Sequence, residues 1–397
     1  MKKILFIAPS LSKGGAERVV ATLSRFLSSE YDVSIAVFSS KRIDYEYEGE
    51  LIDLEIPESQ NRLIKNFKAL RGIKKIKKEI EPDVSVSFLP EPNLINVLSR
   101  TEKEKTIISV RNMLLRILKN FKIPFFISRY IFKREYKKAD AVIPNSEGLK
   151  RDLIENFDLP ENKIKVINNP CSVEEIQEKS EEDLEKEEIE TFEKPTIITV
   201  GSLTEQKGHW HLIRAFKEAK KEIKELNLVI VGEGPLRSYL ERLVENLDLE
   251  NDVHFLGFKD NPFKYVSRSE VFVLSSLYEG LPNVIIESLA CGTPVISTDC
   301  KSGPREILAP NTDITKNTKN IEKAEYGILT PTPDGKKRKA KEPLTKEEKI
   351  LAKAMIKMIK DKEMNKKYSE KSKERVKDFK PEEITQKWKE EILYGKL

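Results

Sequence analysis

Two glutamates, Glu279 and Glu287, stand eight residues apart around a Gly-Leu-Pro turn. An apolar run ends at Leu274 before the turn, and Pro282 suits the first turn of a helix. We therefore expect Glu279 in a loop at the carboxyl end of a strand and Glu287 about one turn inside the following helix. Backbone N–H groups at 281–284 would face an anion, and the carboxylates could accept hydrogen bonds from sugar hydroxyls. This arrangement suits a nucleotide sugar, although two capping or surface glutamates explain the spacing alone equally well.

Two glycine-containing loops could also approach an anion. Gly14 and Gly15 follow the apolar run 4–8 and open an amphipathic helix, which predicts either an anion site at the helix start or an ordinary turn. The second loop begins at Gly232, and Arg237 occupies the place of the third glycine of a dinucleotide fingerprint. The first loop lacks that glycine too, and the Walker lysine motif is absent. Hydride transfer on NAD and P-loop hydrolysis are therefore disfavoured.

The chain is long enough for two hydrophobic cores. It has 397 residues, of which 39% are hydrophobic and 35% charged, and a single core stops growing at roughly 250–300 residues. Three cysteines and three histidines without clustering indicate neither a disulfide scaffold nor a zinc enzyme. No apolar stretch reaches the roughly 18 residues of a membrane span, and the apolar start breaks at Pro9, too early for a signal peptide. We therefore expect a cytoplasmic protein without a metal site.

Apolar runs of strand length alternate with helical segments along the chain. In the first half they lie at 4–8, 33–38, 84–88, 106–110 and 141–143. The alternation restarts in the second half, with runs at 196–200, 228–231, 253–255, 271–274 and 294–297. Continuous apolar strands between helices indicate parallel sheets covered on both faces. We expect an α/β fold with two doubly wound Rossmann-like domains facing a central cleft, and ligands beyond the carboxyl ends of the strands.

An acidic stretch marks the expected domain junction. Between Glu174 and Glu193 lie eleven acidic residues and two lysines, a composition that also fits a solvated helix or linker. We expect the N-terminal domain at 1–175 and the second domain at 195–375. A C-terminal helix at 376–397 is expected to pack back on the N-terminal domain.

Five segments together resemble a known family. They are "EGLPNVIIESLACGTPVI", "VGSLTEQKGHWHLIRAF", "LVIVGEGPLRSYLERL", "VHFLGF" and the N-terminal "GGAERV". Their order and residues resemble family 4 of the retaining glycosyltransferases, which has the GT-B fold, and in particular the subgroup that builds cell-surface polysaccharide and lipid-linked glycans. The resemblance implies that the second domain binds a nucleotide sugar. Glu287 would hold the ribose, Glu279 the transferred sugar, and Lys207 the diphosphate.

The resemblance also implies backbone contacts with the base, sugar and phosphates of the donor. Gly14 and Gly15 would approach the diphosphate and sugar from the first domain. In the second domain the implied donor contacts lie at Ser202, Gly234, Gly257, Phe258, Gly280, Leu281, Pro282, Asn283 and Val284.

The chain departs from the family pattern at two positions. Ser202 stands where the family usually has an arginine that pairs with the equivalent of Lys207, and a hydroxyl cannot supply the charged fork of a guanidinium. Arg305 is either a substitute or an ordinary surface arginine. Many members carry a histidine near the reacting sugar, but no histidine precedes His209 in this chain. By resemblance, Arg111 in "SVRN" would instead face the acceptor or donor phosphates.

The implied reaction moves a hexose or N-acetylhexosamine from a UDP-sugar to a glycan or polyprenyl-linked acceptor. By resemblance the anomeric configuration is retained. The sequence offers no obvious carboxylate nucleophile for double displacement, and no Asp-x-Asp motif in a placement that suggests a metal ligand. We therefore expect no cofactor and a metal-independent transferase. A nucleotide-sugar 2-epimerase of the same fold and a non-catalytic sugar-nucleotide-binding subunit are the alternatives.

The first half of the chain is the basic half. Residues 1–170 hold 31 Lys and Arg against 23 Asp and Glu, a balance of +8, whereas the remainder holds 40 against 43, or −3. Residues 62–78 contain eight basic residues and no acid, and 111–138 contain nine with one acid and many aromatics. A basic, aromatic-rich segment fits an anionic membrane surface, so we expect a peripheral protein at the inner face of the membrane. Core-facing helices with a solvated basic face are the alternative, and no recognition motif supports nucleic-acid binding.

Overall fold

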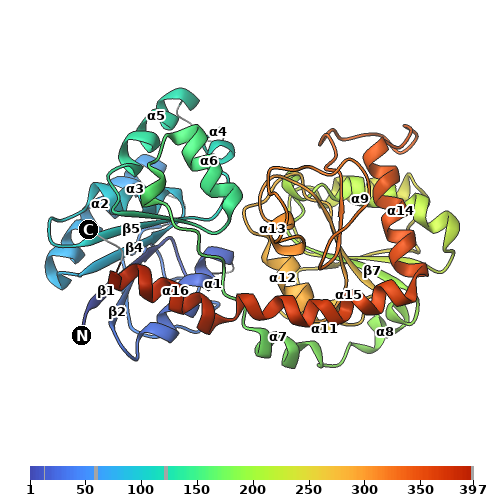
Figure 1. The fold of residues 1–397 in the computed structure, drawn as a ribbon, viewed down its shortest axis with the longest axis horizontal. Helices are drawn as coiled ribbons and strands as arrows, with labels where there is room; N and C mark the ends of the chain where they lie inside the picture. The colour runs from blue at the N-terminus through green and yellow to red at the C-terminus, as the bar shows by residue number, and fades with distance from the viewer. Residues whose placement is uncertain (13, 58–60, 120–123, 395–397) are drawn as a thin grey trace. The chain divides into compact units, whose positions relative to one another are not determined.

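The computed structural model describes residues 1–12, 14–57, 61–119 and 124–394, which form two compact units (Figure 1). The first unit consists of Met1–Pro170 together with Pro381–Leu397, and the second of Cys171–Lys380. Each unit has its own parallel sheet with helices on both faces, so the α/β, doubly wound prediction is confirmed.

The sheet of the first unit has six parallel strands in the order β3-β2-β1-β4-β5-β6. Ile4 of β1 pairs with Val33 of β2 on one side and with Val84 of β4 on the other. The order of the strands therefore reverses between β1 and β4, and ligands of such sheets bind at this switch point. The strands are β1 (Lys3–Ala8), β2 (Asp32–Val37), β3 (Glu50–Asp53), β4 (Val84–Phe88), β5 (Lys105–Val110) and β6 (Ala141–Pro144).

Alternate residues of β1 enter different cores. Ile4 and Phe6 pack with α1 and α16, whereas Leu5 and Ile7 pack with α2 and α3. The helix α16 is distant in sequence yet lies beside α1 (Figure 1). The helices are α1 (Gly15–Leu27), α2 (Arg62–Ile80), α3 (Pro90–Leu98), α4 (Leu114–Lys119), α5 (Phe125–Tyr136), α6 (Glu147–Phe157) and α16 (Pro381–Tyr394).

The sheet of the second unit has the order β12-β13-β11-β10-β7-β8-β9. Its pairs are parallel except β12 with β13. The strand order reverses between β7 and β10, which places the switch point of this sheet there. The strands are β7 (Thr196–Val200), β8 (Asn227–Val231), β9 (Val253–Gly257), β10 (Val271–Leu274), β11 (Val295–Thr298), β12 (Glu322–Lys323) and β13 (Ile328–Thr330).

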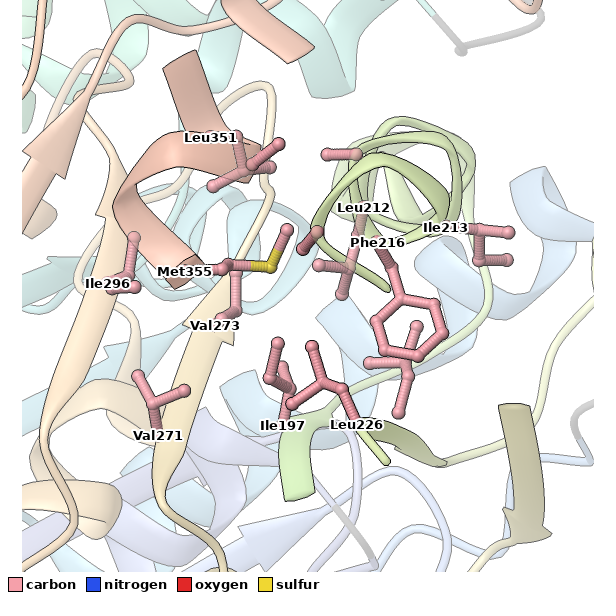
Figure 2. Packing of buried hydrophobic residues seen from close by; sticks show 14 of the residues in the cluster. Ile197, Leu212, Ile213, Phe216, Leu226, Val271, Val273, Ile296, Leu351 and Met355 are labelled. Atoms are coloured by element: carbon pink, nitrogen blue, oxygen red, sulfur yellow. The ribbon is translucent and has the colours of Figure 1, made fainter. Parts of the chain in front are cut away.

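Helices α9 and α14 cover one face of the second sheet. Figure 2 shows Phe216 of α9 and Met355 of α14 above Ile197 and Val273 of the strands. The opposite face packs on α7, α11 and α12. The helices are α7 (Val173–Ser180), α8 (Lys186–Glu193), α9 (His209–Glu222), α10 (Arg237–Glu245), α11 (Phe263–Val266), α12 (Asn283–Ala290), α13 (Pro304–Leu308), α14 (Lys346–Lys360) and α15 (Lys362–Arg375).

The boundary between the two units does not lie in the acidic stretch 174–193, where the sequence predicted it. This stretch forms most of α7 and all of α8, and both belong to the second unit, which begins at Cys171 and ends at Lys380. Val173 and Ile176 enter the core of the second unit, and Glu188 accepts hydrogen bonds from Lys259 and Tyr265. The acidic stretch is therefore part of the second unit and not a linker between the two units. Among the helices of the described residues, none has the length and apolarity needed to cross a membrane.

Candidate active site

Lys207 and Glu279 meet at the switch point of the second sheet. Lys207 ends a short 3₁₀ turn (Glu205–Lys207) in the loop after β7, and Glu279 lies in the loop after β10. The Lys207 ammonium group lies 2.8 Å from Oε1 of Glu279, and the two side chains are 14% and 7% exposed. The Glu279 carboxylate also accepts hydrogen bonds from Gln206 Nε2 at 3.0 Å and Ser276 Oγ at 2.6 Å. The carboxylate is thus held by three donors at the sheet edge where ligands bind.

Backbone contacts fix the two loops that carry this pair. Gly208 has φ of +60°, and a Cβ there would lie 2.5 Å from the carbonyl oxygen of Ser275. The Leu277 N–H donates to the Gln206 carbonyl, and Ser275 Oγ donates to the Lys207 carbonyl, each at 2.8 Å. Because the backbones are this close, position 208 requires glycine. The sequence analysis missed Gln206 and Ser276, although the "SS" after the apolar run 271–274 was a visible signal.

The segment after Glu279 leads into α12. Gly280, Leu281 and Pro282 are buried, and Pro282 is the N-cap rather than part of the first turn. Asn283 and Val284 therefore open the helix, at the end where backbone N–H groups favour an anion. Glu287 is the fifth residue of α12 and is half-buried, so its predicted place about one turn inside the helix is correct.

The loops after β7, β8 and β9 are joined by their backbones. A Cβ on Gly234 would lie 2.6 Å from the Leu203 carbonyl oxygen, and the Leu203 N–H donates to the Glu233 carbonyl at 2.9 Å. The packing of neighbouring loops thus accounts for the glycine at 234. Gly257 has φ of +69°, Phe258 beside it is 51% exposed, and Ser202 is exposed in the loop after β7.

Arg305 is fully engaged inside the second unit. Its Nε and Nη2 donate to the carboxylate oxygens of Asp299 at 3.1 and 2.6 Å, and Nη1 and Nη2 donate to Glu322 at 2.9 and 2.7 Å. Nη1 also donates to Thr312 at 3.2 Å, and the side chain is 5% exposed. Arg305 is therefore neither a surface arginine nor available to replace the phosphate ligand missing at Ser202.

Gly14 and Gly15 lie at the switch point of the first sheet. Gly14 is the N-cap of α1 with extended backbone, and Gly15 is the first helical residue. The Gly14 N–H lies 3.3 Å from the hydroxyl oxygen of Tyr45. A Cβ on Gly14 would overlap the Glu17 carboxylate, which covers this helix start and whose pKa is raised by burial. The helix start is thus arranged around a partly buried carboxylate of its own first turn.

Arg111 follows β5 in the first unit and has a buried guanidinium group. Its central carbon lies 5.0 Å from the ring centroid of Phe88 and 5.7 Å from that of Trp388, and Nη1 donates to Asn169 Oδ1 at 2.6 Å. Nε and Nη2 have no hydrogen-bond partner among the described residues. Burial lowers the pKa of Arg111. The sequence analysis missed Trp388, which reaches this position because α16 packs on the first unit.

Comparisons with known proteins match both halves of the chain to glycosyltransferase models. Residues 13–175 match the family model for Glycosyltransferase Family 4, and residues 179–342 match that for Glycosyl transferases group 1. An uncharacterized glycosyltransferase of Methanocaldococcus jannaschii is 37% identical over 90% of this chain and 92% of its own length. An N-acetylgalactosaminyltransferase of Campylobacter jejuni, whose name specifies a diphospho-undecaprenol-linked acceptor, is 33% identical over 96% of both chains.

Solved structures agree on the fold. HepE of Anabaena, solved with UDP and glucose, has a TM-score of 0.74 at 18% identity and covers 99% of this chain and 100% of its own. The two parallel-sheet units define the GT-B fold. The chain belongs to glycosyltransferase family 4, as its sequence motifs predicted.

Proposed function

We propose that the protein is a retaining glycosyltransferase that moves a hexose or N-acetylhexosamine from a UDP-sugar to a membrane-associated glycan or polyprenyl-diphosphate-linked acceptor. The observation that carries the proposal is the Lys207–Glu279 pair at the second switch point, beside the start of α12. The relative from Campylobacter jejuni supports the lipid-linked acceptor, and UDP and glucose in HepE support the donor class.

In this proposal the second unit binds the donor. Glu287 accepts hydrogen bonds from the ribose hydroxyls, and Glu279 accepts one from the transferred sugar. Lys207 and the first N–H groups of α12 meet the diphosphate. The bond between the anomeric carbon and the phosphate oxygen breaks, and negative charge grows on the departing diphosphate. Positive groups held in place before the reaction stabilise that charge, so the step needs neither a metal ion nor a cofactor.

The first unit contributes Arg111. A buried guanidinium group with two unpartnered nitrogen atoms favours an anion, because an unpaired buried charge costs several kcal/mol. The rings of Phe88 and Trp388 keep water from its faces. We assign this group to a phosphate of the donor or of the acceptor.

Two helices of the first unit suit an anionic membrane surface. On α2, Leu63, Ile64 and Phe67 are exposed beside basic residues of the same helix. On α5, Phe126, Tyr130 and Arg134 are exposed, and so is Lys137 directly after the helix. Residues 120–123 lie outside the described residues. Exposed aromatic and aliphatic side chains among cations favour shallow insertion at a lipid surface. We therefore propose a peripheral protein at the inner face of the membrane.

Product analysis tests the function. The protein is incubated with sugar-labelled UDP-glucose, UDP-galactose and their N-acetyl forms, with and without a polyprenyl-diphosphate-linked glycan. The proposal expects acceptor-dependent release of UDP and a new glycosidic bond whose anomeric configuration, read by NMR, equals that of the donor. An epimerised donor, or bound donor without any turnover, would contradict it.

A further inference from the structure

The ion pair at the candidate active site carries no net charge. The positive charge of Lys207 is offset by the negative charge of Glu279, whose Oε1 lies 2.8 Å from the ammonium group. A departing diphosphate adds further negative charge. Electrostatic stabilisation of such a leaving group requires positive groups aimed at it. The site therefore needs at least one more cation than this pair provides.

Several basic side chains at the carboxyl edge of the second sheet already have carboxylate partners. Arg305 is held by Asp299 and Glu322. Arg237, the first residue of α10, pairs with Glu233 and Glu241. In the loop after β13, Lys337 pairs with Glu205 and Arg338 with Asp334. Lys301, in the loop after β11, is exposed and has no ion-pair partner within the described part of the chain. Its charge is thus available to a ligand.

The loop that carries Lys301 is bonded to the segment that carries Glu279. Before Lys301, Thr298 Oγ1 donates to the Ser276 carbonyl at 2.5 Å. After it, Ser302 Oγ donates to the Gly280 carbonyl at 2.7 Å. Hydrogen bonds on both sides of Lys301 therefore hold its loop against the segment 276–280, which contains Glu279.

Two further observations place and hold this loop. Gly303 has φ of +92°, and a Cβ there would lie 2.6 Å from the Gly280 carbonyl oxygen. Burial raises the pKa of the Cys300 thiol; the Glu279 charge raises this pKa further and the Lys207 charge lowers it. The residue before Lys301 is thus an electrostatic neighbour of the active-site pair.

We propose that Lys301 binds the donor diphosphate and supplies the second cation of the site. This inference rests on the proposed function. A lysine carries a compact charge on a flexible stem, so its ammonium group can donate hydrogen bonds to phosphate oxygens while the loop backbone stays fixed. Because the phosphate charge grows as the sugar bond breaks, the contact strengthens in the transition state. Lys301 therefore acts on kcat as well as on donor affinity.

Calorimetric titration with nucleotides tests the inference. UDP, UMP and uridine are titrated into the wild-type protein, Lys301→Met, Lys301→Arg and the control Lys319→Met, which removes an exposed lysine from another loop of the same unit. Lys301→Met is expected to weaken UDP binding by about tenfold or more, as loss of a charged hydrogen bond does. The affinity for UMP is expected to fall less, and the affinity for uridine is expected to stay unchanged. Lys301→Arg should retain most of the affinity, and Lys319→Met all of it.

The outcomes separate the inference from the function on which it rests. If UDP does not bind the wild-type protein, the proposed transfer from a UDP-sugar is wrong. If UDP binds the wild type and Lys301→Met equally tightly, the donor site stands and Lys301 is not part of it. An equal loss in Lys319→Met would also overturn the inference, because the effect would then come from net charge alone.

Discussion

The Lys77 ammonium group lies 2.6 Å from the Glu104 carboxylate, and neither side chain is exposed. Lys77 also donates to Asn96 Oδ1 at 2.7 Å. The sequence analysis counted Lys77 among the cations of 62–78 that would face a membrane, but it points into the first unit. The charge that can reach a lipid surface from the last turns of α2 therefore comes from Lys74, Lys75 and Lys78, which are exposed.

Replacing Lys77 tests the buried pair. Lys77→Met should lower the free energy of unfolding by about 3–5 kcal/mol, because it leaves the Glu104 carboxylate buried without its partner. Urea denaturation measures the change. Lys78→Met on the exposed face should stay within about 0.5 kcal/mol of the wild type, and Lys77→Met with Glu104→Gln should recover part of the loss. Equal effects of Lys77→Met and Lys78→Met would contradict the pairing.

Membrane binding is expected to depend on the exposed lysines of α2. Each cation near an anionic surface adds about 1 kcal/mol of attraction, and salt weakens it. Replacing Lys74, Lys75 and Lys78 by Ser should therefore release the protein from liposomes that contain anionic lipid. Co-sedimentation at low and high salt measures this, with neutral liposomes for comparison.

A matched variant controls for net charge. Lys346, Lys349 and Lys353 are exposed on α14 of the second unit, and their replacement by Ser removes the same charge. This variant should sediment like the wild type. Absence of liposome binding at every salt concentration, or equal release of both variants, would show that the basic face of α2 is only solvated.

Arg305 is expected to matter for stability and not for nucleotide binding. Arg305→Met leaves the nearly buried Asp299 carboxylate without its cation and should cost about 3–5 kcal/mol of unfolding free energy. Under conditions where the variant is folded, its affinity for UDP should remain within about twofold of the wild type. A loss of UDP affinity without a loss of stability would contradict this prediction and would indicate that Arg305 binds a phosphate of the donor.

His209 should make the second unit less stable in acid. Burial lowers its pKa from 6.5 to about 3, with a smaller contribution from the Lys207 charge. Below pH 6.5 the unfolded chain therefore binds a proton that the folded protein does not, so stability falls as pH falls. Between pH 7 and pH 5 the loss from this group is about 2 kcal/mol. In His209→Gln, the free energy of unfolding from denaturation curves should fall between pH 7 and pH 5 by about 2 kcal/mol less than in the wild type. If the fall is the same in both proteins, groups other than His209 cause it.

The strands were predictable because most of their residues are apolar or β-branched and stand in short runs between helical segments. The residues 84–88, 196–200 and 271–274 form strands with those bounds. The short strands β3, β12 and β13 were missed, because β3 and β12 contain charged residues and β13 has only three residues. The buried position of Lys77 had a signal: it shares a helix face with Ile73 and Ile80.

Contacts between loops that are distant in the chain could not be predicted from the sequence. Lys207 and Glu279 are 72 residues apart, and they meet because β7 and β10 are neighbours, which the order of strands along the chain does not reveal. Arg305 meets Glu322 because the two-residue β12 brings that carboxylate back to α13, the helix that carries Arg305. The family motifs supplied the Lys207–Glu279 association that spacing alone could not.

The most direct test of the account is the single-turnover rate of sugar transfer in Lys207→Met, measured with labelled UDP-sugar and a polyprenyl-diphosphate-linked acceptor. Removing one preorganised group that meets the developing charge typically costs about 10²–10³ in rate. The account predicts a loss of that size, with uridine still binding as a sign that the second unit is folded. Transfer at the wild-type rate would contradict it, because the diphosphate would then leave from somewhere other than the Lys207–Glu279 site.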